Sequence, residues 1–208
     1  MGSVDEPSWC WHPRTRRFYG IESRASEDFN TALYHLDFVN RPSTGVGLYG
    51  STAVSSHLVV RDACMRYWSH RDVLVVLGYS NSAAVMRIQI YDPRSPGVAQ
   101  NMTLTGTTLP VCAPGFAYVP HLNSGNGAFF MRDPTAGQEQ KLWRIDPPSS
   151  AFASTAWTVT LITMAGDTVS GTSPNGVWKR FDFAPQINSL IWVSSVTSAV
   201  YAYNVGTS

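Results

Sequence analysis

Charged side chains are scarce in this 208-residue chain and make up 14% of it, whereas a typical soluble domain contains about 25%. Lysine and arginine number 15, aspartate and glutamate number 14, and the formal net charge at pH 7 is +1. Nucleic-acid binding needs a basic stripe or patch, and the densest basic group is the short turn from Arg14 to Arg17. We therefore expect no nucleic-acid partner and a surface that meets other protein.

Long hydrophobic runs are also missing, since the best is Val73–Leu77 and a membrane helix needs about 18 apolar residues. The first residues, Met1–Pro7, are acidic and lack the apolar stretch of a secretory signal. These two absences predict a soluble protein without a membrane partner. We expect it in the cytoplasm or assembled into a particle such as a virion.

Cysteine is rare and has no metal-binding spacing. Cys10, Cys64 and Cys112 are widely separated and form no Cys-x-x-Cys pair, which argues against a zinc ribbon or a thioredoxin-type site. We expect three reduced thiols that pack as small hydrophobic groups. The sequence predicts neither a metal nor a cofactor.

An internal repeat is present, and it organises the whole chain. One element reads aromatic or apolar, any residue, aromatic, any residue, Pro or Ser, and then a polar residue. It alternates with period two and ends at a turn former, which predicts a strand followed by a hairpin. Its four copies are Trp9–Arg14, Met65–His70, Phe116–His121 and Phe181–Gln186.

Further strands are expected after each copy. Second strands are predicted at Phe18–Ile21, Val73–Tyr79, Ala128–Met131 and Leu190–Val193. Third strands, each ending in an acid or its amide that can close a turn, are predicted at Tyr34–Asp37, Gln89–Asp92, Trp143–Asp146 and Tyr201–Asn204. Fourth strands are predicted at Val46–Tyr49, Asn101–Thr105 and Trp157–Thr163, and no stretch shows helical periodicity.

Four strands repeated about every 50 residues are typical of a β-propeller blade. The pattern resembles the kelch and galactose-oxidase-like propellers, most closely over Asn175–Pro185 and Val200–Asn204. The resemblance implies one all-β repeat domain over residues 1–208, built of four-stranded antiparallel blades, with units at 9–62, 63–113, 114–176 and 177–208. The kelch double glycine is absent, and a two-sheet β-sandwich is the competing fold.

The last unit has no fourth strand, because the chain stops at Ser208. Either a short strand around Val4 closes the ring, or the four units form an open arc. An open arc exposes apolar faces at both ends. Two such arcs could pair into an eight-bladed ring, or one arc could dock on a partner.

Candidate binding residues come from the loops and strand ends of this arrangement. Arg14, His70, His121 and Gln186 hold equivalent turns and would share one rim, although polar residues are ordinary in hairpin turns. A zinc site from His12, His70 and His121 is disfavoured, because ligands from separate blades seldom meet within about 2.1 Å of one point. Long loops on the opposite rim are where binding usually occurs. The residues selected for ligand or partner binding are Asp28, Arg61, His70, Tyr79, His121, Arg132, Asp133 and Trp178.

No catalytic motif is present, because the Gly-x-Ser-x-Gly, phosphate-loop and His-Glu-x-x-His patterns are all missing. We therefore favour a non-enzymatic binding or assembly module, a protein–protein component of a larger particle such as a virion. One alternative is a carbohydrate-binding, lectin-like propeller that uses aromatic side chains on its rim. The other is a propeller-type glycoside hydrolase or oxidase with carboxylates from distant blades.

Overall fold

The computed structural model describes residues 5–23, 32–37, 48–54, 61–80, 85–95, 97–166, 180–193 and 199–206. It confirms the all-β class: these residues form strands and short 3-10 segments such as η2 at Pro185–Ile187, and contain no α-helix. The strands fall into two compact units, Met1–Met102 and Thr103–Ser208.

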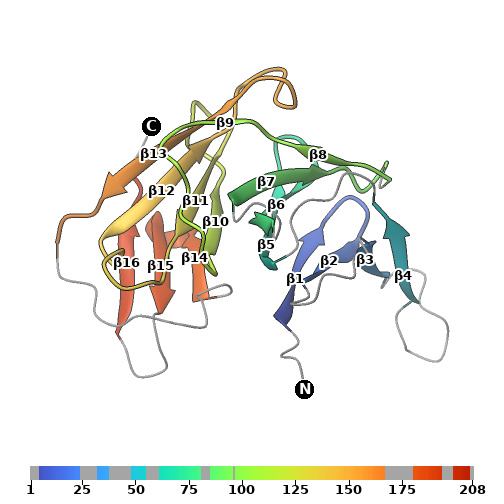
Figure 1. The fold of residues 1–208 in the computed structure, drawn as a ribbon, viewed down its shortest axis with the longest axis horizontal. Coiled ribbons are helices and arrows are strands. Elements are labelled where there is room, and N and C mark those ends of the chain that lie inside the picture. Colours follow the sequence, from blue (N-terminus) through green and yellow to red (C-terminus); the bar gives the residue numbers. More distant parts are fainter. Residues whose placement is uncertain are drawn as a thin grey trace. The chain divides into compact units, whose positions relative to one another are not determined.

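The first unit contains two four-stranded antiparallel sheets, each with its strands in sequence order (Figure 1). One sheet consists of β1 (Asp5–His12), β2 (Arg17–Ser23), β3 (Ala32–Asp37) and β4 (Leu48–Ala53). The other consists of β5 (Arg61–Trp68), β6 (Val73–Ser80), β7 (Val85–Tyr91) and β8 (Ala99–Asn101).

The second unit repeats this plan with two changes at its edges. Its first sheet is antiparallel over β10 (Gly115–Val119), β11 (Ala128–Arg132), β12 (Lys141–Asp146) and β13 (Trp157–Thr163), and β9 (Leu104–Gly106) pairs parallel with β13. Its second sheet has three strands, β14 (Phe181–Ala184), β15 (Ser189–Val193) and β16 (Val200–Asn204). The prediction of four-stranded antiparallel sheets is thus confirmed for the first two repeats, and in the third repeat a fifth, parallel strand joins the four antiparallel ones.

The predicted strand at Asn101–Thr105 is wrong as a single element. Met102 interrupts it, and its backbone N–H donates to Ile88 O at 2.9 Å, whereas Thr103 O accepts from Trp157 N at 2.9 Å. The chain therefore leaves the β5–β8 sheet at Asn101 and joins the β10–β13 sheet at Leu104. Sequence pattern could not show this switch, because both halves have the composition of an edge strand. The strand predicted around Val4 lies outside the described residues.

The hairpins between the first two strands support the repeat. Residues 13–16, 69–72 and 185–188 form four-residue connections in the first, second and fourth repeats, whereas the third uses residues 120–127. The last residue of each short connection has a positive φ: 54° at Arg16, 56° at Asp72 and 49° at Asn188. Asp and Asn tolerate this left-handed conformation better than most residues do.

The acids at the ends of the third strands divide into two groups. Asp92 Oδ1 accepts the backbone N–H of Arg94 at 2.9 Å, and Asn204 Oδ1 accepts that of Gly206 at 2.8 Å, as the turn-closing prediction requires. Asp37 Oδ2, on β3, instead lies 2.7 Å from Arg17 Nη2 on the neighbouring strand β2. Asp146 Oδ1 lies 2.9 Å from Arg144 Nε on the same strand, β12.

In the first unit, the core lies between the two sheets. Tyr19, Ile21 and Leu33 of the β1–β4 sheet form one cluster with Met65, Leu74 and other residues of the β5–β8 sheet. β1 lies beside β5. Each sheet contributes every second residue of its strands, as the pleat requires.

The core of the second unit follows the same register. Ala117, Phe130 and Leu142 of the β10–β13 sheet pack with Phe181, Leu190 and Trp192 of the β14–β16 sheet, and β10 lies beside β14. Counted from the hairpins, Phe130 is the counterpart of Tyr19, and Leu190 is the counterpart of Leu74. Each unit thus packs one sheet on the next through equivalent faces.

Candidate functional site

A polar cluster centred on Asp72 joins the two sheets of the first unit. Asp72 ends the β5–β6 turn, and its side chain is 12% exposed. Its Oδ1 accepts the hydroxyl of Tyr67 at 2.9 Å. Its Oδ2 lies 3.0 Å from Arg14 Nε and 3.4 Å from Arg94 Nη1. Three segments distant in sequence therefore converge on one carboxylate.

His12, at the end of β1, is the buried member of this cluster. Its Nδ1 accepts the backbone N–H of Thr15 at 3.2 Å, so the proton of the neutral ring belongs on Nε2. Nε2 donates toward Asp72, with its carbonyl oxygen at 3.2 Å and Oδ1 at 3.3 Å. Both ring nitrogens are thus used inside the protein, and the side chain is 0% exposed.

The chemistry of the cluster is that of a structural network. General-base catalysis needs one imidazole nitrogen within reach of substrate, and both nitrogens of His12 already bind protein groups. Burial, and then the hydrogen bond to Asp72, raise the pKa of Tyr67, so its hydroxyl stays a donor at neutral pH. Arg94 binds Asp92 at 2.8 Å and lowers the pKa of that carboxyl. We assign this network to fastening the first hairpin onto the second sheet.

Arg132, a predicted binding residue, lies inside the second unit at 1% exposure. It ends β11, and its Nη1 donates to the Glu139 carbonyl at 2.9 Å. Its guanidinium carbon lies 4.8 Å from the ring centroid of Trp192 on β15, a distance suited to a cation–π contact. Burial lowers the pKa of Arg132 to about 10, so the group remains a cation at neutral pH. It occupies the core position that Ile21 holds in the first unit.

Asp133, the neighbouring predicted residue, is 2% exposed and closes a local turn. Its Oδ1 accepts the backbone N–H of Thr135 at 2.9 Å and the Thr135 hydroxyl at 2.7 Å. The structure thus brings Arg132 and Asp133 together at the beginning of one loop, where the guanidinium binds the loop backbone and the carboxylate shapes it.

The residues predicted to share a rim lie in hairpins, as expected. Arg14 and His70 belong to the two connections that meet at Asp72 in the first unit. In the second unit, the exposed ring of His121 lies 5.6 Å from Phe183, and exposed Gln186 lies in η2. Because two of these side chains belong to each unit, a collar of all four stays a prediction.

The remaining predicted residues have the following positions. Tyr79 is half-buried near the end of β6, and Arg61 is its backbone partner on β5. The Arg61 side chain lies outside the described part, as do Asp28 and Trp178.

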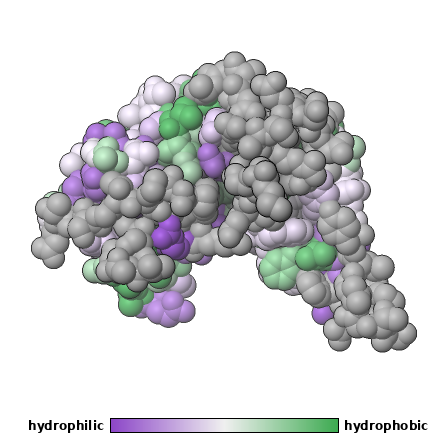
Figure 2. All heavy atoms as spheres, turned by 60° about the horizontal axis from the view of Figure 1, so that its bottom comes forward, coloured by the Kyte–Doolittle hydropathy of each residue, from purple (hydrophilic) through white to green (hydrophobic). Residues whose placement is uncertain are grey.

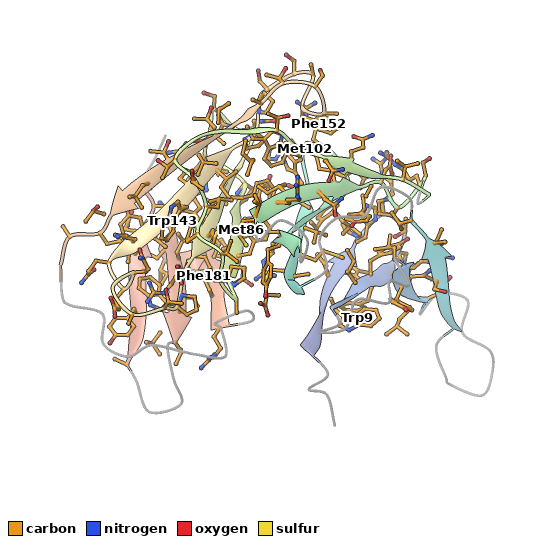
Figure 3. The ribbon with its side chains drawn as sticks, in the orientation of Figure 1. Trp9, Met86, Met102, Trp143, Phe152 and Phe181 are labelled. Carbon is orange, nitrogen blue, oxygen red and sulfur yellow. The ribbon has the colours of Figure 1, made fainter. Side chains whose placement is uncertain are left out.

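The side of the β1–β4 sheet that faces away from the first core carries several large apolar groups. We call this surface the aromatic face; its residues are Trp9, Trp11, Phe18, Gly20, Tyr34 and Leu36. Trp11 is 39% exposed and Phe18 is 38% exposed, and their ring centroids lie 5.0 Å apart across the strand pair. Figure 3 shows the Trp9 indole on this side of β1 and β2. A Cβ added to Gly20 would lie 2.7 Å from Trp9 Cδ2, so the glycine lets the indole lie flat on the sheet.

Sequence reasoning missed Asp72 and the aromatic face as sites. Asp72 carried one usable signal, because it is the last residue of a polar turn and Asp is common where φ is positive. The residues of the aromatic face showed only a period-two alternation in the sequence, and buried and exposed strands share this alternation. Period-two alternation shows which residues point the same way but not which side is covered.

The chain has no match among protein-family models, curated proteins or solved structures. Within the described ranges, no helix is long and apolar enough to cross a membrane, and no group of three or more His, Cys, Asp or Glu side chains could hold a metal ion. Cys10, Cys64 and Cys112 form no disulfide. Burial raises the pKa of Cys64 to about 12, which makes its thiolate rare at neutral pH.

Proposed function

We propose that this protein is a non-enzymatic binding and assembly module, and that the aromatic face of the β1–β4 sheet is its protein-contact surface. The observation that carries the proposal is the exposure of Trp11 and Phe18 beside one another on a regular sheet. Aromatic side chains supply large contact areas at little cost in conformational entropy, and they are enriched at the centres of protein interfaces. The natural setting of such a module is a larger particle, such as a virion.

The charge distribution supports a protein partner. The aromatic face presents no lysine, arginine, aspartate or glutamate among its six residues, and interface centres are depleted in charge. On the side shown in Figure 2, hydrophobic residues occur in small groups among hydrophilic ones within the described part.

A propeller-type arrangement is the finer fold that we propose for the repeat. Both units pack one sheet on the next through equivalent faces, with the first strands β1 and β5, or β10 and β14, side by side. Propeller blades pack in this manner, with the first strand of each blade innermost.

Hydroxyl-radical footprinting tests the proposed surface. The oxidation rates of Trp11 and Phe18 are compared between dilute purified protein and the same protein in an extract of its natural source. We expect both rates to fall at least about threefold in the extract, because a protein partner excludes solvent from the face. The reference is Val111, which is 45% exposed and lies in a loop of the second unit, and its rate should not change. Equal rates for Trp11 and Phe18 under the two conditions would contradict the proposal.

A further inference from the structure

The aromatic face has buried counterparts in the other sheets. Counted from the hairpins, Trp9 corresponds to Met65 of β5 and Phe181 of β14. Met65 and Phe181 are both 0% exposed and lie in the two sheet–sheet cores. In both units, therefore, this face of the later sheet packs on the earlier sheet.

The exposed pair on the aromatic face follows the same correspondence. Phe18 occupies the position of Leu74 in β6 and of Leu190 in β15. Both leucines are 0% exposed, whereas Phe18 is 38% exposed. The aromatic face is thus of the type that, in the later sheet of each unit, packs against the preceding sheet.

In the β14–β16 sheet, the face of the Leu74 type is buried and the other face is exposed. We call its side away from the second core the aliphatic face; its apolar residues are Ile191, Val193, Val200 and Ala202. Val193 corresponds to Ile21, which is 2% exposed, and Val200 to Leu33, which is 0% exposed. Val200 itself is 69% exposed. This face is thus of the type that, in the earlier sheet of each unit, packs against the following sheet.

We propose that the occupant of the aromatic face is the aliphatic face of a second copy of this chain. The inference rests on the proposed function, which it deepens by naming the partner. The two faces are of complementary types, since in each unit a face of the Ile21 type packs on one of the Leu74 type. Contact between different patches on two copies is heterologous, and it closes into a ring when the rotation allows.

Paired surface variants test this head-to-tail contact. Trp11→Lys places a charge on the aromatic face, and Val200→Lys places one on the aliphatic face. The matched control is Val111→Lys, which introduces the same charge at an exposed valine in neither face. The mass of each full-length chain is measured by light scattering and sedimentation over a range of concentrations, and circular dichroism checks its folding. Phe18→Lys and Val193→Lys replace either variant that fails to fold.

We expect the unmodified chain and Val111→Lys to form the same dimer. Trp11→Lys and Val200→Lys should each weaken dimerisation at least tenfold. An equimolar mixture of these two variants should form a heterodimer, because one copy keeps an intact aliphatic face and the other an intact aromatic face. This complementation is the result that only a head-to-tail contact gives.

Three results would overturn the inference. The first is an unmodified chain that stays monomeric, which would mean that a sheet of the same chain or another protein covers the aromatic face. The second is a dimer that survives Val200→Lys, which would mean that two aromatic faces meet. The third is failure of the mixture to associate. A monomer whose Trp11 is nevertheless protected in the extract would remove the second copy as partner and leave the proposed binding function standing.

Discussion

At the scale of single residues, Asp72 has the largest set of partners in the first unit's polar cluster. Its carboxylate accepts from Tyr67 and lies within 3.4 Å of His12, Arg14 and Arg94. Removing one partner from a mostly buried network leaves the others without compensation. The turn conformation adds to this dependence, because the φ of 56° at Asp72 suits Asp or Asn better than Ala.

We predict that Asp72→Ala lowers the free energy of unfolding by about 3 kcal/mol, and that Asp72→Asn lowers it by about half as much. Asparagine keeps the turn conformation and one acceptor oxygen but loses the charge. Urea denaturation followed by tryptophan fluorescence measures both changes. The control is Asp146→Ala, which breaks a partly exposed pair with Arg144 and should cost about 0.5 kcal/mol or less. Equal losses from Asp72→Ala and Asp146→Ala would contradict the assigned role.

At the scale of elements, the β1–β2 pair depends on a glycine beneath a tryptophan. Trp9 and Gly20 are cross-strand partners, and any side chain at Gly20 would enter the indole. The pair lies on the aromatic face, so its packing also sets the shape of the proposed contact surface.

We predict that Gly20→Ala lowers the free energy of unfolding by about 1–3 kcal/mol, because the added methyl group forces Trp9 out of its position. Thermal unfolding followed by near-ultraviolet circular dichroism reports both the stability and the environment of the indole. Gly97→Ala is the matched control, since a Cβ there meets nothing within 4 Å, and its stability should change by less than about 0.5 kcal/mol. A Gly20→Ala chain as stable as Gly97→Ala would show that the indole moves at no cost.

The elements were also the most predictable level of the structure. Second strands expected at Phe18–Ile21 and Val73–Tyr79 appear as β2 (Arg17–Ser23) and β6 (Val73–Ser80), because alternation and turn residues are local signals. The strand expected at Asn101–Thr105 was wrong because its two halves bind different sheets, which is a long-range choice. Local pattern sets where a strand forms, whereas the partner of an edge strand depends on the rest of the chain.

At the scale of the whole molecule, the four sheets differ in how well they are covered. Residues Val73–Leu77 of β6 are at most 4% exposed, and β11 is buried throughout, whereas β16 alternates between exposed and half-buried positions. Regions with few buried apolar contacts open at low free energy. The last sheet is therefore the place where opening of the fold should begin.

We predict that backbone amides of β16 exchange with solvent at least about tenfold faster than those of β6 and β11. Native-state hydrogen exchange followed by mass spectrometry measures the rates, and the Val200→Lys chain is used so that self-association does not protect β16. Exchange of all three strands at one common rate would instead show that the chain opens only by global unfolding.

Local features of the sequence were sufficient to predict the all-β class, the four copies of the first hairpin and most strand positions, because alternation and turn chemistry act over a few residues. Only the tertiary structure decided which side of each sheet is covered and which polar groups meet. His12 and Asp72 are 60 residues apart, and Arg132 reaches Trp192 from another sheet. These contacts depend on the packing of whole sheets, and no local pattern contains that information. The exposure of the aromatic face was likewise decided by the tertiary structure, because the burial of a strand depends on which other parts of the chain pack against it.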